Sequence, residues 1–97
     1  MEVLEEAVRT VQELGFSTVL DLEEHHNGKV IIIYRVELNG KVIGYIGSDL
    51  SMCIAGPELT VEEYSKVLEL VVRLRKEFGF KLSEDSECRL VKVIMKL

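Results

Sequence analysis

Near the start of the chain, apolar residues recur every three or four positions, the spacing of a helix with one buried side. In residues 3–14 the apolar positions are Val3, Leu4, Ala7, Val8, Val11 and Leu14. Gly15 follows and can take the left-handed conformation that ends a helix, while Phe16 is placed to pack back on Val11. The pattern predicts an amphipathic first helix that ends at Gly15.

A second helical pattern, after residue 60, is more apolar than one buried stripe requires. Its apolar positions are Val61, Tyr64, Val67, Leu68, Leu70, Val71, Val72, Leu74 and Phe78. Thr60 and Glu63 have the spacing of a capping box, Leu59 and Tyr64 that of a hydrophobic staple, and Gly79 provides the stop. We therefore expect a helix to about residue 78 that either has neighbours on two sides or contributes an interface.

Between the helices lie three strand-like runs, at residues 18–24, 29–38 and 41–47. The pairs Asn27-Gly28 and Asn39-Gly40 separate these runs. An Asn-Gly pair between two strands is typical of a hairpin turn, because both residues tolerate a positive φ. Two consecutive hairpins predict a three-stranded antiparallel meander.

The register of the first hairpin depends on the length of its turn. A two-residue turn would place Leu20 and Leu22 opposite Arg35 and Ile33, on the more polar face of the middle strand. A three-residue turn with Gly28 in a bulge instead places the leucines opposite residues 34 and 32. We prefer the bulged turn, because it brings both leucines to the core side.

The rest of the chain completes one α+β domain over residues 1–97. Residues 52–55 are apolar enough for a short edge strand or a tucked loop, and the alternation in residues 88–97 predicts a final strand. We expect the order α-β-β-β-α-β, with an antiparallel sheet of four or five strands and both helices on one face.

Charge and composition narrow the classes of partner. The 97 residues carry a formal net charge of −5, which repels phosphate backbones and anionic lipids, so we expect neither nucleic-acid nor membrane partners. No apolar run is long enough to span a membrane and the N-terminus is acidic, so we expect a cytoplasmic protein. Many Glu and Lys residues with few amides resemble a thermophile composition.

Candidate chemistry is sparse. Cys53 and Cys88 lie in no metal-type spacing, so we expect free, partly buried thiols, with a Cys53–Cys88 disulfide as the alternative. His25 and His26 follow two glutamates at a hairpin tip and form a candidate zinc or transition-metal site. Because adjacent strand residues point to opposite faces, a solvated tip is the favoured interpretation.

A small-molecule or catalytic site is the second hypothesis. Asp49, Ser51 and Cys53, in the irregular segment at residues 48–56, are its candidate ligand-binding residues, although this pattern is also ordinary turn chemistry. The sequence contains no nucleophile-elbow, zinc-protease or P-loop motif. We therefore lean towards a protein without enzymatic activity and expect no cofactor.

The first hypothesis is a protein-interaction module that forms a homodimer and also has a possible protein partner. Ile31, Ile33 and Ile46 are expected on the sheet face away from the helices, and Leu70 on the apolar side of the second helix. These four residues are the candidate interface.

Two families resemble the predicted order of elements. The helix, meander and helix are similar to a double-stranded RNA-binding domain, but residues 60–63 read Thr-Val-Glu-Glu where that family carries lysines. The order also looks like that of type III secretion chaperones, which are homodimers that present apolar surface to partner segments. This second resemblance implies self-association.

Overall fold

The computed structural model of the chain describes residues 2–26, 29–54 and 58–82. The helices and strands in this part of the chain are α1 (Glu2–Glu13), β1 (Ser17–His26), β2 (Lys29–Leu38), β3 (Lys41–Gly47), β4 (Ser51–Ile54), α2 (Val61–Phe78) and β5 (Lys81–Leu82). The predicted α+β class is confirmed. Of the two alternatives left open for residues 52–55, a short strand or a tucked loop, the structure has a strand, β4, which adds one strand to the expected order. The strand predicted at residues 88–97 lies outside the described residues.

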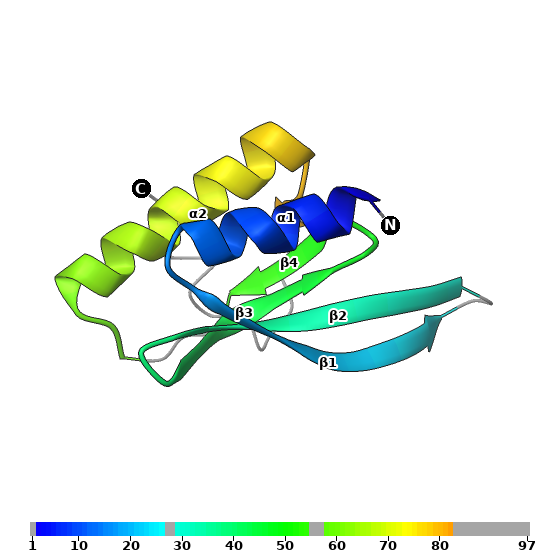
Figure 1. Cartoon of the computed structure of the whole chain (residues 1–97), viewed down its shortest axis with the longest axis horizontal. Coiled ribbons are helices and arrows are strands. Elements are labelled where there is room, and N and C mark those ends of the chain that lie inside the picture. Colours follow the sequence, from blue (N-terminus) through cyan, green and yellow to red (C-terminus); the bar gives the residue numbers. More distant parts are fainter. Residues whose placement is uncertain (1, 27–28, 55–57, 83–97) are drawn as a thin grey trace.

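The strands form one sheet in the order β1-β2-β3-β4-β5. Both helices lie on the same face of this sheet, as predicted (Figure 1). The first four strands are antiparallel to their neighbours, but β5 runs parallel to β4, so the expectation of a purely antiparallel sheet is wrong at this edge. The physical reason is the connection, because α2 carries the chain back along the sheet before β5 begins.

The predicted helix ends are confirmed. Gly15 has φ 97°, and the amide of Phe16 donates to the carbonyl of Val11 at 3.2 Å. Gly79 is left-handed with φ 76°, and the amide of Phe80 donates to the carbonyl of Leu74 at 3.1 Å. These ends return the chain to the core, where Phe16 and Phe80 are both buried.

The core lies between the sheet and the two helices. Its buried apolar residues in the described part of the chain are Leu4, Ala7, Val11, Phe16, Val36, Leu38, Ile43, Ile46, Met52, Ile54, Val67, Leu70, Val71, Leu74 and Phe80. The excess apolar character of α2 is largely explained by this packing, with α2 also contacting α1. Among its large apolar side chains, Val61 and Val72 are the exposed ones.

The first hairpin corrects one prediction. β1 and β2 remain paired as far as His26 and Lys29, so only two residues separate the strands and the bulge is not in the turn. The register shifts at Asp21 instead, which leaves Leu20 opposite Tyr34 as expected but Leu22 opposite Ile33.

The second hairpin has the predicted tight turn, followed by a bulge that was not predicted. Asn39 and Gly40 have φ 52° and 76°, the positive values that an Asn-Gly hairpin turn uses. One extra residue then enters β3, because Glu37 pairs with Val42 and Val36 with Gly44. The extra residue is Ile43, which is fully buried.

Candidate functional site

The side of the sheet away from the helices carries a group of incompletely buried side chains. Along β2, core-facing residues alternate with residues on this opposite side. Arg35 pairs with Val19 on β1 and with Tyr45 on β3, which brings both neighbours to the same side. We call this surface the outer face and define it by Val19, Ile31, Ile33, Arg35, Glu37 and Tyr45.

The apolar members of the outer face keep contact with solvent. Val19 is 41% exposed, and Ile31, Ile33 and Tyr45 are half-buried. The described part of the chain thus buries the core between the sheet and the helices, but it leaves these apolar side chains of the outer face only partly covered. Apolar surface of this kind marks interaction sites when it is contiguous.

Arg35 connects the charged side chains of the outer face through hydrogen bonds to two carboxylates. Its Nε donates to Glu37 Oε2 at 2.6 Å, and its Nη1 donates to Asp21 Oδ1 at 3.1 Å. The hydrogen bond that Arg35 donates to Glu37 is the main cause of the raised pKa of Arg35, and the charge of Asp21 adds to it. The arginine is thus compensated by two carboxylates within the same surface.

Sequence reasoning placed Arg35 on the more polar face but missed its partner Asp21. Asp21 reaches the arginine from the bulge in β1, where the register shifts. The available signal was the single arginine on a strand next to a strand that carries one aspartate. The bulge and this ion pair occur at the same place in β1.

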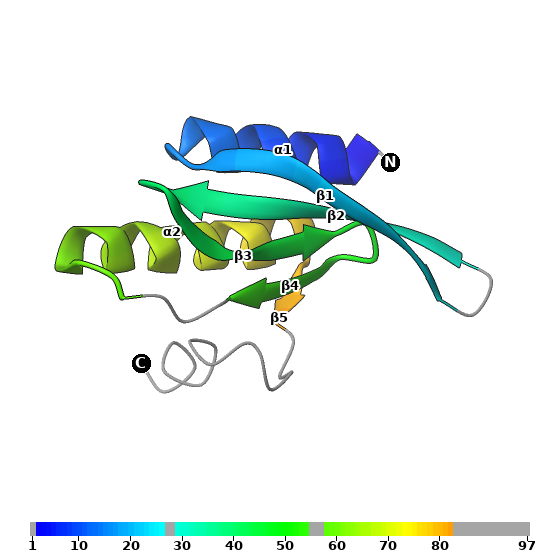
Figure 2. The same ribbon diagram turned by 90° about the horizontal axis from the view of Figure 1, so that it is seen from below.

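The end of the first hairpin extends beyond the helices (Figures 1 and 2). We call residues 20–26 and 29–34 the hairpin arm. On its helix-facing side, Leu20 is 57% exposed and Val30 is 48% exposed. The helices therefore leave Leu20 and Val30 largely uncovered, while Ile32 and Tyr34 on the same side pack against the core.

Two predicted interface residues belong to the core. Ile46 pairs with Tyr34 and Met52 on the helix-facing side of the sheet and is 1% exposed, so its expected place on the outer face is wrong. The bulge at Ile43 is the reason, since it reverses the side to which Ile46 points. Leu70, on the buried side of α2, is also 1% exposed and belongs to the core.

The segment that follows β3 forms a turn held by its own polar side chains. Asp49 Oδ1 accepts hydrogen bonds from the amide of Ser51 at 3.1 Å and from Ser51 Oγ at 2.6 Å. Ser48 Oγ accepts from the amide of Ile32 at 3.0 Å. Asp49 and Ser51 thus come together, but as partners within the turn.

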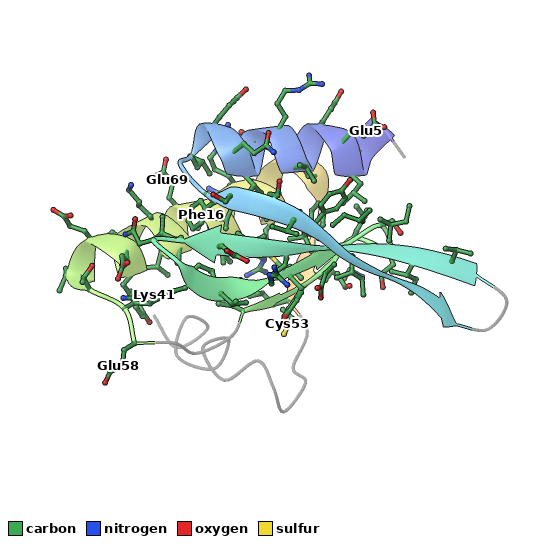
Figure 3. All side chains as sticks on the ribbon, turned by 60° about the horizontal axis from the view of Figure 1, so that its bottom comes forward. Glu5, Phe16, Lys41, Cys53, Glu58 and Glu69 are labelled. Atoms are coloured by element: carbon green, nitrogen blue, oxygen red, sulfur yellow. The ribbon has the colours of Figure 1, made fainter. Side chains whose placement is uncertain are left out.

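Cys53, the third candidate of this segment, lies on β4 opposite Tyr45. Figure 3 places it on the side of the sheet away from α1. It is half-buried and is not a free thiol, which corrects the expectation for this cysteine. Cys88 lies outside the described residues.

His25 and His26 occupy the last two positions of β1, where they pair with Val30 and Lys29. The structure describes their backbone and not their side chains, so the metal site stays a prediction. Among the residues that were searched, those the structure describes, no group of three or more His, Cys, Asp or Glu side chains is placed to hold a metal ion.

Two shallow hollows lie near the end of α2. One, of about 210 Å³, is lined by Arg75, Phe80, Lys81 and Leu82, and the other, of about 300 Å³, by Val72, Arg75 and Lys76. Arg75 and Lys76 are exposed in the last turn of α2, where cations favour the helix dipole, whereas Lys81 lies on β5. A role in helix stability accounts for Arg75 and Lys76.

Within the described residues, no helix has the length and apolar character needed to cross a membrane. Comparison of the chain with protein-family models, with curated proteins and with solved structures finds no match.

Proposed function

We propose that this protein is a non-enzymatic, cytoplasmic interaction module that acts as a homo-oligomer, most simply a homodimer. The observation that carries the proposal is the outer face, where Val19, Ile31 and Ile33 remain in contact with solvent although the core is closed. Ile31 and Ile33 are the two predicted interface residues that lie on this surface.

The polar chemistry supports an interaction role over catalysis. Asp49 and Ser51 hydrogen-bond to each other and hold a turn, and Arg35 is engaged by two carboxylates. A catalytic site needs a nucleophile or base directed at a substrate rather than at a structural partner. The proposal therefore includes no cofactor.

The net charge of −5 supports a protein partner rather than a nucleic acid or an anionic membrane. A second copy of the chain is the first such partner, and a different protein that uses the same surface is compatible with the module.

The test is the mass of the full chain in solution. Light scattering and sedimentation equilibrium, from low to high micromolar concentration, are expected to give a concentration-dependent rise from the 11.0 kDa of the monomer to twice that mass. A chain that remains a monomer at high micromolar concentration contradicts the proposal.

A further inference from the structure

We infer that residues 89–97 of this same chain pack over the outer face, and that a disulfide between Cys53 and Cys88 holds them there. This segment lies outside the described residues. Such an intrachain cover goes beyond the function proposed above, because it forms in the monomer whether or not the chain self-associates. It also limits access to the outer face, since a second copy must displace the cover.

Cys53 belongs to the same side of the sheet as the outer face. It pairs with Tyr45 on β3, and Tyr45 pairs with Arg35 on β2. Val19 on β1 completes this row opposite Arg35. Residues directly opposite each other on neighbouring strands point to the same side. Cys53, labelled in Figure 3, is therefore the β4 end of a row that crosses the outer face.

The sulfur of Cys53 is engaged in a disulfide, and Cys88 is the only other cysteine of the sequence. A disulfide holds its two Cα atoms within about 4.4–6.8 Å of each other. Leu82 on β5 pairs with Met52, the residue before Cys53, so the six residues that lead on to Cys88 are long enough to reach it. The bond therefore brings the start of residues 89–97 to the outer side of β4.

The apolar content of residues 89–97 gives the segment a reason to pack against the sheet. Six of its nine residues are apolar, namely Leu90, Val91, Val93, Ile94, Met95 and Leu97. Burial of such side chains is favourable, and the helix-facing side of the sheet is already occupied by the core. Among the surfaces that the structure describes, the outer face is the partly covered apolar surface at the tether.

The charges of the segment and of the outer face are complementary. The ionisable side chains of residues 89–97 are all basic, namely Arg89, Lys92 and Lys96. On the outer face, two carboxylates, Asp21 and Glu37, surround the single cation of Arg35. A basic segment is attracted to this surface, and the net charge of −5 of the whole chain adds to the attraction.

The length of the segment matches the width of the outer face. The row from Cys53 to Val19 crosses three strand spacings of about 4.8 Å, or about 14 Å. Nine extended residues span about 30 Å. Residues 89–97 are therefore long enough to cross the whole row from the tether.

Reduction loosens the cover without detaching the segment. A dithiol reductant supplies two electrons and two protons, so that Cys53 and Cys88 become thiols while the reductant forms its own disulfide. The segment stays joined to β5 through residues 83–88. Disulfides of cytosolic proteins in mesophiles are usually catalytic or redox-sensing, so the cover would respond to the thiol redox state of such a compartment.

The test uses two tyrosines on opposite sides of the sheet. Tyr45 lies on the outer face, and Tyr34, which packs against the core on the helix-facing side, is the matched control. Both are half-buried in the structure. NMR with a soluble paramagnetic probe, at low micromolar concentration, compares the oxidised full-length chain with a chain that ends at Cys88 and so keeps the disulfide but lacks the cover.

Truncation after Cys88 should remove the protection of the Tyr45 ring and leave that of Tyr34 unchanged. Cys88→Ser, which keeps the segment but not the tether, is the second variant should the truncated chain fail to fold, and it should weaken the protection of Tyr45. In sedimentation equilibrium, a cover closed for about nine-tenths of the time raises the apparent dissociation constant of a dimer about tenfold, so truncation should lower it by that factor.

The outcomes separate the cover from the proposed function. Equal accessibility of Tyr45 in all three chains overturns the cover, as does a rise at Tyr34 that matches the rise at Tyr45. A disulfide-linked pair of chains in the unreduced protein also overturns it. If Tyr45 loses its protection on truncation but every chain remains a monomer at high micromolar concentration, the cover stands and the proposed homo-oligomer fails.

Discussion

Lys41 on β3 donates a hydrogen bond from its Nζ to Oε1 of Glu63 on α2 at 2.7 Å, which fastens the second hairpin to the start of the helix. The same carboxylate accepts hydrogen bonds from Asn39 Nδ2 and from the amide of Thr60, both at 2.8 Å. Its side chain is only 7% exposed. One glutamate therefore completes the capping box and joins two elements distant in sequence.

Stability should depend on pH through Glu63. The hydrogen bond from Lys41, followed by those from Thr60 and Asn39, lowers the pKa of Glu63 from 4.5 to about 2. Because the folded pKa lies below the unfolded value, the stabilisation is complete above pH 4.5 and is lost as the pH falls towards 2.

Glu63→Gln tests this dependence, since glutamine keeps the shape but not the charge. We expect a lower melting temperature than wild type at pH 7 and a difference that shrinks as the pH falls from 4.5 to 2. Thermal unfolding of both chains across this range is the measurement. A difference that stays constant with pH assigns the acid sensitivity to another group.

Gly44 and Gly40 should respond differently to alanine. A Cβ at Gly44 would overlap the carbonyl oxygen of Cys53 on the next strand, whereas a Cβ at Gly40 meets nothing within 4 Å. We expect Gly44→Ala to cost about 3 kcal/mol or more, and Gly40→Ala, which must hold a φ of 76°, about 1–2 kcal/mol. Chemical unfolding measures both, and an equal or smaller cost at Gly44 contradicts the close approach of β3 and β4.

Leu70→Ala distinguishes a core residue from an interface residue. Leu70 is 1% exposed within the described monomer, so its truncation should lower the free energy of unfolding by about 2–5 kcal/mol. The dimer dissociation constant of the folded fraction should not change. If Leu70→Ala instead weakens the dimer while the free energy of unfolding stays unchanged, Leu70 is an interface residue.

The two cysteines of the chain are expected to be oxidised. Cys53 is not a free thiol, and Cys88 is the other cysteine of the sequence. We therefore expect a disulfide between them, closing a loop of about 35 residues and stabilising the fold by up to about 4 kcal/mol. Thiol titration of the unfolded, unreduced chain should find none, and Cys53→Ser should expose one; two thiols in the wild type contradict the disulfide.

Local signals predicted the helix ends, while long-range contacts decided the strand faces. Gly15, Gly79 and the Thr60–Glu63 pair act within one turn of their helix, so the sequence pattern is enough to find them. Their positions fix where α1 and α2 stop and return to the sheet.

The bulges are the part that sequence patterns could not predict. Strict alternation from Asn39-Gly40 would place Ile46 opposite Ile33, but the extra residue in β3 places it opposite Tyr34, so that Ile43 and Ile46 are both buried. The same shift brings Tyr45 to the outer face beside Arg35. The candidate surface could therefore be located from Ile31 and Ile33, but its full membership required the register.

The most direct test of the account is the solvent accessibility of individual methyl groups by NMR, with a soluble paramagnetic probe, as a function of protein concentration. We expect the methyl groups of Val19 and Ile33 to become protected as the concentration rises, while those of Leu20 and Val61 stay accessible throughout. Accessibility of Val19 and Ile33 that is the same at every concentration would contradict packing of the outer face against a second copy.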